Sequence, residues 1–297
     1  MLQTDLTLKI EQHLSIICNE LGNHHVGSPG NRQATDYAER ILASLGFETR
    51  TKPFDCIEWQ SGDVTLEAGG RLWSAHVSPY SLPFDGDGEL TAISSLGDLA
   101  VADIAGKIVL LHGEIAREQV MPKNFVFYNP DHHKKLVSLL EEGAPAALIC
   151  ATERNPETAG SVYPFPLFED GDFDIPSVVV TDVEGSQLLA HIGSVVHLAF
   201  DSLRIPATGT NVIASKGRSG IPSIVLCAHI DAKKDTPGAL DNATGVATLL
   251  GLAELLATMI ARRGSRSSCS MVRTTTPYLV RCNIWRSWGM EFATSIW

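Results

Sequence analysis

Long apolar runs, closely spaced cysteines and positive charge are what this sequence has least of. No apolar stretch approaches the roughly 18 to 20 residues that a membrane span requires. The six cysteines lie far apart, with no CxxC pair, which argues against both a disulfide framework and a cysteine zinc site. Lysine and arginine total 23 against 34 aspartates and glutamates, so the net charge is -11. The sequence therefore predicts a soluble acidic protein with neither a membrane nor nucleic acid as its partner.

The amino-terminal segment lacks the parts of a signal peptide, since it has no basic start, no continuous apolar core and no small-residue cleavage site. Its apolar residues recur instead at helical spacing, at Leu6, Ile10, Leu14, Ile17 and Leu21. Residues 1–22 are therefore predicted to form an amphipathic helix. Together with the scattered cysteines, this favours a cytoplasmic location.

The patterning up to residue 258 predicts an α/β domain that a second domain interrupts. Residues 1–57 contain helix, helix and strand signals, and residues 207–258 add two strands and an amphipathic helix that starts near Asn242. Residues 58–206 hold short apolar runs separated by glycine, proline and aspartate, with two helical pieces among them. We therefore predict one discontinuous domain and one inserted domain.

Residues 259–297 break with this composition. They hold six arginines and one acidic residue, Glu291, and show neither helical nor strand periodicity. A shift of reading frame near residue 258 is the preferred explanation, and a genuinely divergent tail is the alternative. This basic tail is predicted to be disordered, and a nucleic-acid role for it is not favoured.

A buried strand leads into the segment with the most specific residues. Residues 223–228 are apolar at nearly consecutive positions, as in a strand covered on both faces, and His229 and Asp231 follow. Because strand side chains alternate, His229 and Asp231 point to the same side. One imidazole nitrogen can then bind a metal while a carboxylate orients the other. Asp241, at the entrance to the next helix, is a candidate for the second ligand.

Each of these residues also has a purely structural interpretation. His229 alone is compatible with an ordinary polar residue at a strand end. Asp241 alone is compatible with a helix N-cap, which stabilises by about 1 kcal/mol. Taken together, and with PGALDNATG at 237–245, the residues favour a metal site.

With these motifs the sequence resembles peptidase family M28, the co-catalytic zinc aminopeptidases and their carboxypeptidase relatives. HHVGSPGNRQATDYAERILASLGFE at 24–48 resembles the amino-terminal loop and helix of the family. Within 58–206, the segments GKIVLLHGE, EEGAPAALIC and DIPSVVVTDVEG resemble a protease-associated domain. The resemblance covers about residues 1–258. It implies an incomplete three-layer α/β/α peptidase domain with a mixed sheet, plus an inserted, mostly-β protease-associated domain.

The resemblance also implies a role for each candidate residue. His229 and Asp241 are implied as zinc ligands, with Asp241 bridging the two zinc ions of a complete family site, and Asp231 as the carboxylate that orients His229. The implied reaction is removal of N-terminal residues from a peptide substrate by a metal-activated water. Aminopeptidase, dipeptidase and carboxypeptidase activities stay open, as do residue preference, oligomeric state and the partner of the protease-associated domain.

The remainder of the family's site is missing from this sequence. The family takes its general base from a Glu-Glu pair, and further ligands from a later Asp and His. Here Glu254 and Glu291 are the only acidic residues after Asp241, and no histidine follows His229. We therefore expect weak zinc binding and an inactive chain.

Two histidine pairs, His24–His25 and His132–His133, are candidates to replace the missing ligands. Both pairs are expected to be solvated, and neither is expected to take that role. The alternative function is a non-catalytic interaction module that uses the protease-associated domain and a vestigial peptidase scaffold to bind a partner.

Overall fold

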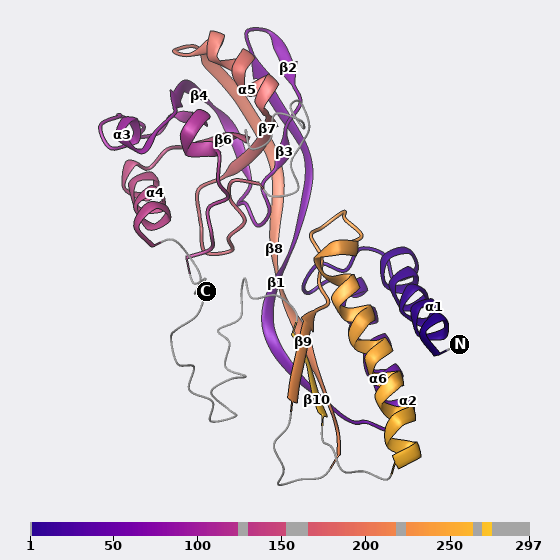
Figure 1. Ribbon diagram of the computed structural model, residues 1–297. Coiled ribbons are helices and arrows are strands. Elements are labelled where there is room, and N and C mark those ends of the chain that lie inside the picture. The colour runs from indigo at the N-terminus through magenta and orange to yellow at the C-terminus, as the bar shows by residue number, and fades with distance from the viewer. Residues whose placement is uncertain (1, 124–129, 153–165, 218–223, 264–268, 275–297) are drawn as a thin grey trace. The chain divides into compact units, whose positions relative to one another are not determined.

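The computed structural model describes residues 2–123, 130–152, 166–217, 224–263 and 269–274 (Figure 1). The chain divides into two compact units, residues 1–58 with 206–297, and residues 59–205. Two long strands, β1 (Glu48–Ala68) and β8 (Val195–Lys216), contribute residues to both units. Each unit has a core of its own.

Helices packed beside a short group of strands make up the first unit (Figure 1). Its elements, besides its parts of β1 and β8, are α1 (Leu2–Ser15), α2 (Pro29–Ser44), β9 (Ile224–His229), α6 (Thr244–Arg263) and β10 (Cys269–Thr274). The predicted helix over 1–22 is present as α1 and a following π-helical turn at Ile16–Glu20. Helix α6 packs against β9, and both α1 and α2 contact α6.

The apolar stripe of α6 lies in the core of this unit. Val246, Leu250 and Ala253 are fully buried, and they share one cluster with residues of α2, β8 and β9. Helix α2 begins where the Ser28 hydroxyl accepts a hydrogen bond from the Asn31 amide at 3.0 Å, with Pro29 in the first turn. The amphipathic spacing and the cap signals in the sequence thus account for both helices.

A buried histidine joins three helices of the first unit. Nδ1 of His13 in α1 lies 2.6 Å from the Tyr37 hydroxyl of α2, and Nε2 lies 3.0 Å from Oε1 of Glu254 in α6. Lys9 pairs with the same carboxylate. Glu254 therefore has a structural role between helices.

Strand β10 lies in the basic tail, where the sequence predicts disorder. The structure differs from that prediction at two places, because α6 continues to Arg263 and Cys269–Thr274 form a strand. Strand β10 is antiparallel to β8, with Cys269 opposite Lys216, and parallel to β9, with Cys269 opposite Ile224. Open strand edges offer main-chain N–H and C=O groups to a segment of any side-chain pattern. Residues 275–297 lie outside the described part of the chain.

Parallel strands form the centre of the second unit. The strand order is β8-β4-β5-β6-β7-β3, and β4 through β7 pair in parallel. The strands are β2 (Arg71–Trp73), β3 (His76–Val77), β4 (Phe84–Ile93), β5 (Ile108–Leu111), β6 (Ala147–Thr152) and β7 (Ser177–Thr181). The helices are α3 (Leu96–Leu99), α4 (Pro130–Gly143) and α5 (Asp182–Leu188), with 3-10 turns at Gly113–Ala116 and Leu189–His191.

Both faces of these parallel strands are buried. In β5, Val109 and Leu111 belong to a core cluster that α4 covers, whereas Ile108 and Leu110 belong to a cluster on the other face. All four side chains are fully buried. This alternation explains why the sequence of β5 reads as a continuous apolar run.

In the described part of the chain the architecture is mixed α/β, with a mixed sheet of ten strands. In the first unit, helices α1, α2 and α6 share one core with β8 and β9. The second unit, which is expected to be mostly β, has a parallel centre whose strands alternate with helices. No helix in the described ranges is both long and apolar enough to cross a lipid bilayer.

Candidate functional site

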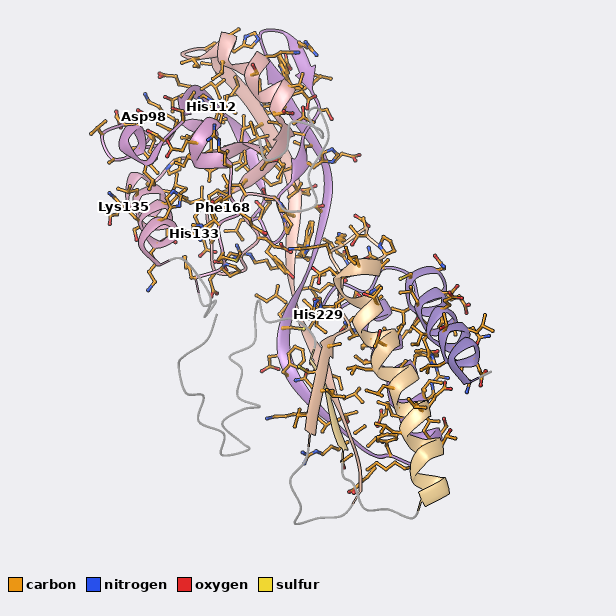
Figure 2. The ribbon with its side chains drawn as sticks, in the orientation of Figure 1. Asp98, His112, His133, Lys135, Phe168 and His229 are labelled. Atoms are coloured by element: carbon orange, nitrogen blue, oxygen red, sulfur yellow. The ribbon has the colours of Figure 1, made fainter. Side chains whose placement is uncertain are left out.

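The site begins where β9 ends, at His229 (Figure 2). Nδ1 of His229 lies 3.4 Å from Oδ1 of Asp231 and 3.2 Å from the Asp231 carbonyl oxygen. Asp231 is buried, with its side chain 6% exposed. The structure thus brings together the two residues that strand alternation places on one side.

Asp241 contacts the other nitrogen of the same imidazole. Its Oδ1 lies 2.8 Å from Nε2 of His229, and its side chain is 71% exposed. Asp241 lies in the π-helical turn Ala239–Ala243, where its own φ of -126° and ψ of 88° are not helical. At the start of α6, it is the Asn242 side chain that accepts a hydrogen bond, which the Gly245 amide donates at 3.2 Å. Asp241 is therefore directed at His229 and not at the helix end.

Two carboxylates thus face the two nitrogens of one imidazole. The hydrogen bond with Asp231 raises the pKa of His229 to about 9, with burial opposing and the charges of Asp231 and Asp241 adding to the increase. The raised pKa favours the protonated ring, which donates at both nitrogens. A metal ion can bind this ring only in exchange for a proton.

The donor types suit zinc, but the described residues supply too few of them. Zinc binds imidazole nitrogen and carboxylate oxygen at about 2.0 to 2.2 Å, which places two tetrahedral ligands about 3.4 Å apart. The 2.8 Å separation of His229 and Asp241 is that of a hydrogen bond instead. Within the described ranges, no group of three or more histidine, cysteine or acidic side chains is arranged to hold a metal. A catalytic zinc takes three protein ligands, so the described residues alone do not complete such a site.

The prediction that the two histidine pairs are solvated is wrong for three of the four residues. His24 is 1% exposed, His25 9% and His133 4%. His24 and His25 are buried because their loop packs against the segment that follows β9, where the Ala232 amide donates to the His24 carbonyl at 3.3 Å. His133 lies on the inner face of α4, and the Met121 amide donates to its Nδ1 at 3.4 Å. Neither pair joins His229 in a metal-binding group of described residues.

Sequence reasoning did not find the contacts of Asn23, whose Nδ2 donates to Oδ1 of Asp235 at 2.9 Å. No spacing rule links these residues, which are 212 positions apart. The available signal is indirect, since the turn-rich loop between Asn23 and Ser28 leads directly into a helix cap.

Several known peptidases are similar to this chain. Residues 211–268 match the model of peptidase family M28, so the match extends past residue 258, where the sequence-based resemblance ends. The chain is 28% identical over 241 residues to a Mycobacterium tuberculosis protein described as "Probable lipoprotein aminopeptidase LpqL". It is 21% identical over 248 residues to a Pseudomonas aeruginosa protein described as "Aminopeptidase". These alignments cover 77% and 80% of this chain but only 44% and 45% of the relatives, so the chain spans less than half of their length.

Solved structures show the same fold. The aminopeptidase from Aneurinibacillus sp. strain AM-1 superposes with a TM-score of 0.68 at 21% identity, covering 91% of this chain and 62% of that one. The zinc aminopeptidase BSAP from Bacillus subtilis gives a TM-score of 0.66 at 17% identity, covering 91% and 61%. The segment that ends β9 and starts α6, with His229, Asp231 and Asp241, lies within residues 211–268, the part of the chain that is similar to peptidase family M28.

Proposed function

We propose that this chain represents part of a zinc-dependent exopeptidase that removes N-terminal residues from peptides. The observation that carries the proposal is the convergence of Asp231 and Asp241 on the two nitrogens of His229. In this proposal His229 and Asp241 hold zinc, and Asp231 fixes the orientation of the imidazole. Bound zinc would supply an activated water and polarise the scissile carbonyl. The names of the aminopeptidase relatives support this choice of activity over the dipeptidase and carboxypeptidase alternatives.

By itself, this chain is proposed to be inactive. General base catalysis requires a carboxylate that takes the proton of the attacking water. After Asp241 the sequence holds only two carboxylates, Glu254 and Glu291. Glu254 is engaged by His13 and Lys9 between helices, and Glu291 lies outside the described residues. The number of zinc ions, two in the complete family, is part of the same proposal.

Zinc uptake tests the proposed metal site, and peptide hydrolysis tests the proposed inactivity. We expect the chain to take up Zn²⁺ weakly in competition with a chromophoric chelator, and His229→Ala and Asp241→Ala to abolish the uptake. His76→Ala, an exposed histidine of β3, is the matched control and should leave uptake unchanged. Equal uptake by His229→Ala would refute the site assignment. Release of p-nitroaniline from leucine p-nitroanilide, lost in His229→Ala, would refute the proposed inactivity.

We further propose that residues 58–206 form a protease-associated domain. The three motifs of this region and the compact unit at 59–205 support the proposal. Limited proteolysis of the full chain should then leave a resistant fragment with ends near residues 58 and 206. Early cleavage inside β5 or β6 would contradict it.

The alternative, a non-catalytic interaction module, draws support from the two-ligand donor set. It becomes the better account if no reading frame of the gene supplies the missing base and ligands. The cytoplasmic location stays a prediction, and the Mycobacterium tuberculosis relative is described as a lipoprotein.

A further inference from the structure

We propose that the loop from Asn23 to Ser28 is a positioning element for the site, with Asn23 as its key residue. The loop holds the segment from Asp231 to Asp235 in place and thereby keeps Asp231 against His229. The role of the loop in metal binding rests on the proposed function. Its effect on the position of the segment from Asp231 to Asp235 does not.

Two contacts tether the segment that follows the site. The Ala232 amide donates to the His24 carbonyl at 3.3 Å, directly after Asp231. The Asn23 side chain donates from Nδ2 to Oδ1 of Asp235 at 2.9 Å. The tethers therefore lie one and four residues beyond the carboxylate that orients the imidazole.

The Asp235 carboxylate, which can only accept, determines which groups of Asn23 and His25 donate and which accept. The carboxylate of Asp235 accepts, so the amide nitrogen of Asn23 must face it. Oδ1 of Asn23 then faces Nδ1 of His25 at 3.2 Å, and this ring nitrogen must carry the proton. The buried Nε2 of His25 has no hydrogen-bond partner among the described residues and lies 3.8 Å from Oε1 of Glu58. Asn23 therefore links the buried imidazole of His25 to the tethered segment through a single side chain.

The loop is itself anchored to the start of α2. The Ser28 hydroxyl donates to the Asn23 carbonyl at 3.3 Å and accepts from the Asn31 amide. A Cβ added at Gly30 would lie 2.0 Å from the Asn23 carbonyl oxygen, so only glycine permits this close approach. The tether thus connects the segment after β9 to a capped helix, which is a rigid support.

Exchanging the two tethered side chains provides the test. Asn23→Ala removes both contacts of the amide, and Asn23→Asp places two carboxylates against each other. Combining Asn23→Asp with Asp235→Asn restores the hydrogen bond with donor and acceptor reversed, and still leaves an acceptor for His25. Asparagine also tolerates the φ of 62° at position 235. Asn19→Ala, an exposed asparagine whose Nδ2 donates to Ser15, is the control.

The readout is hydrogen exchange of the full chain over residues 230–236, measured by mass spectrometry. We expect about tenfold faster exchange in Asn23→Ala and Asn23→Asp, and a return towards the native rate in the double variant. Exchange within β5 and β6 should not change. Native exchange in both single variants, or no recovery in the double variant, would overturn the proposal. If Asn23→Ala does not fold, Asn23→Asp and the double variant decide the question.

Zinc uptake separates this proposal from the proposed function. If the native chain takes up Zn²⁺, its affinity should fall in Asn23→Asp and recover in the double variant. Native affinity in Asn23→Asp would overturn the positioning role towards the metal. If the native chain takes up no Zn²⁺, the proposed metal site fails, and the exchange measurement still decides whether the loop positions the segment.

Discussion

Nε2 of His229 lies 2.8 Å from Oδ1 of Asp241, a contact that joins the end of β9 to the turn before α6. The two atoms proposed to bind a metal therefore bind each other in this structure. Asp231 lies beside the other ring nitrogen. The imidazole therefore contacts two carboxylates, of which Asp231 is 6% exposed and Asp241 71% exposed. Loss of the buried carboxylate should therefore cost more stability than loss of the exposed one.

Asp231→Asn should destabilise the chain much more than Asp241→Asn. Asp231 is buried beside the imidazolium, and a hydrogen bond to a charged group contributes about 1.5 to 3 kcal/mol. Asp241 is mostly exposed, and an exposed ion pair contributes about 0.2 to 1 kcal/mol. Urea unfolding of both variants measures the difference in the free energy of unfolding. Equal losses would mean that burial does not distinguish the two carboxylates.

His133 should make the second unit less stable as the pH falls. Burial, and then the charge of His132, lower the pKa of His133 below its usual value near 6.5, although Glu118 opposes this. The unfolded chain therefore takes up a proton at a higher pH than the folded chain. This contribution to stability is complete above about pH 6.5 and is lost as the pH falls towards the folded pKa.

His133→Gln should accordingly narrow the difference in stability between pH 7.5 and pH 5.5, measured by urea unfolding at both values. His76→Gln, at an exposed position of β3, is the control and should leave the difference as it is. A native pH dependence in His133→Gln would show that other groups carry the effect.

Leu250→Ala should cost about 2 to 5 kcal/mol, because the side chain is fully buried where α6 meets the core of the first unit. Leu240→Ala removes the same atoms from a side chain that is 86% exposed, and should cost less than about 0.5 kcal/mol. Thermal or urea unfolding of the two variants provides the comparison. A small loss in Leu250→Ala would mean that α6 is not packed as described.

The sequence predicts those parts of the fold that local patterns control. The apolar run at 108–111 forms β5, the run before His229 forms β9, and the stripe through Val246 and Leu250 is buried in α6. Strand alternation predicts that His229 and Asp231 lie on one side, and the structure brings them together although β9 ends at His229.

Long-range contacts account for what the sequence does not predict. The tether between Asn23 and Asp235, and the burial of His25, depend on two loops that no periodic pattern connects. Strand β10 is held by the main chains of β8 and β9, and main-chain pairing leaves little signature in side-chain order. Local propensity is a weak guide in such cases because tertiary contacts override it.

The position of β10 sharpens the prediction of a frameshift. In the parallel register of β9 and β10, Thr274 lies opposite His229. Catalytic residues of open α/β sheets gather at the carboxyl ends of the strands, so we expect the gene to encode a base for this site near the end of β10. The sequence has threonine at both Thr275 and Thr276. We expect the encoding DNA, translated in all three frames from about codon 250, to contain a Glu-Glu pair near codon 275, followed by a later Asp and a final His. If no frame contains them, the catalytic account fails, and binding of a partner by a vestigial peptidase scaffold becomes the better explanation.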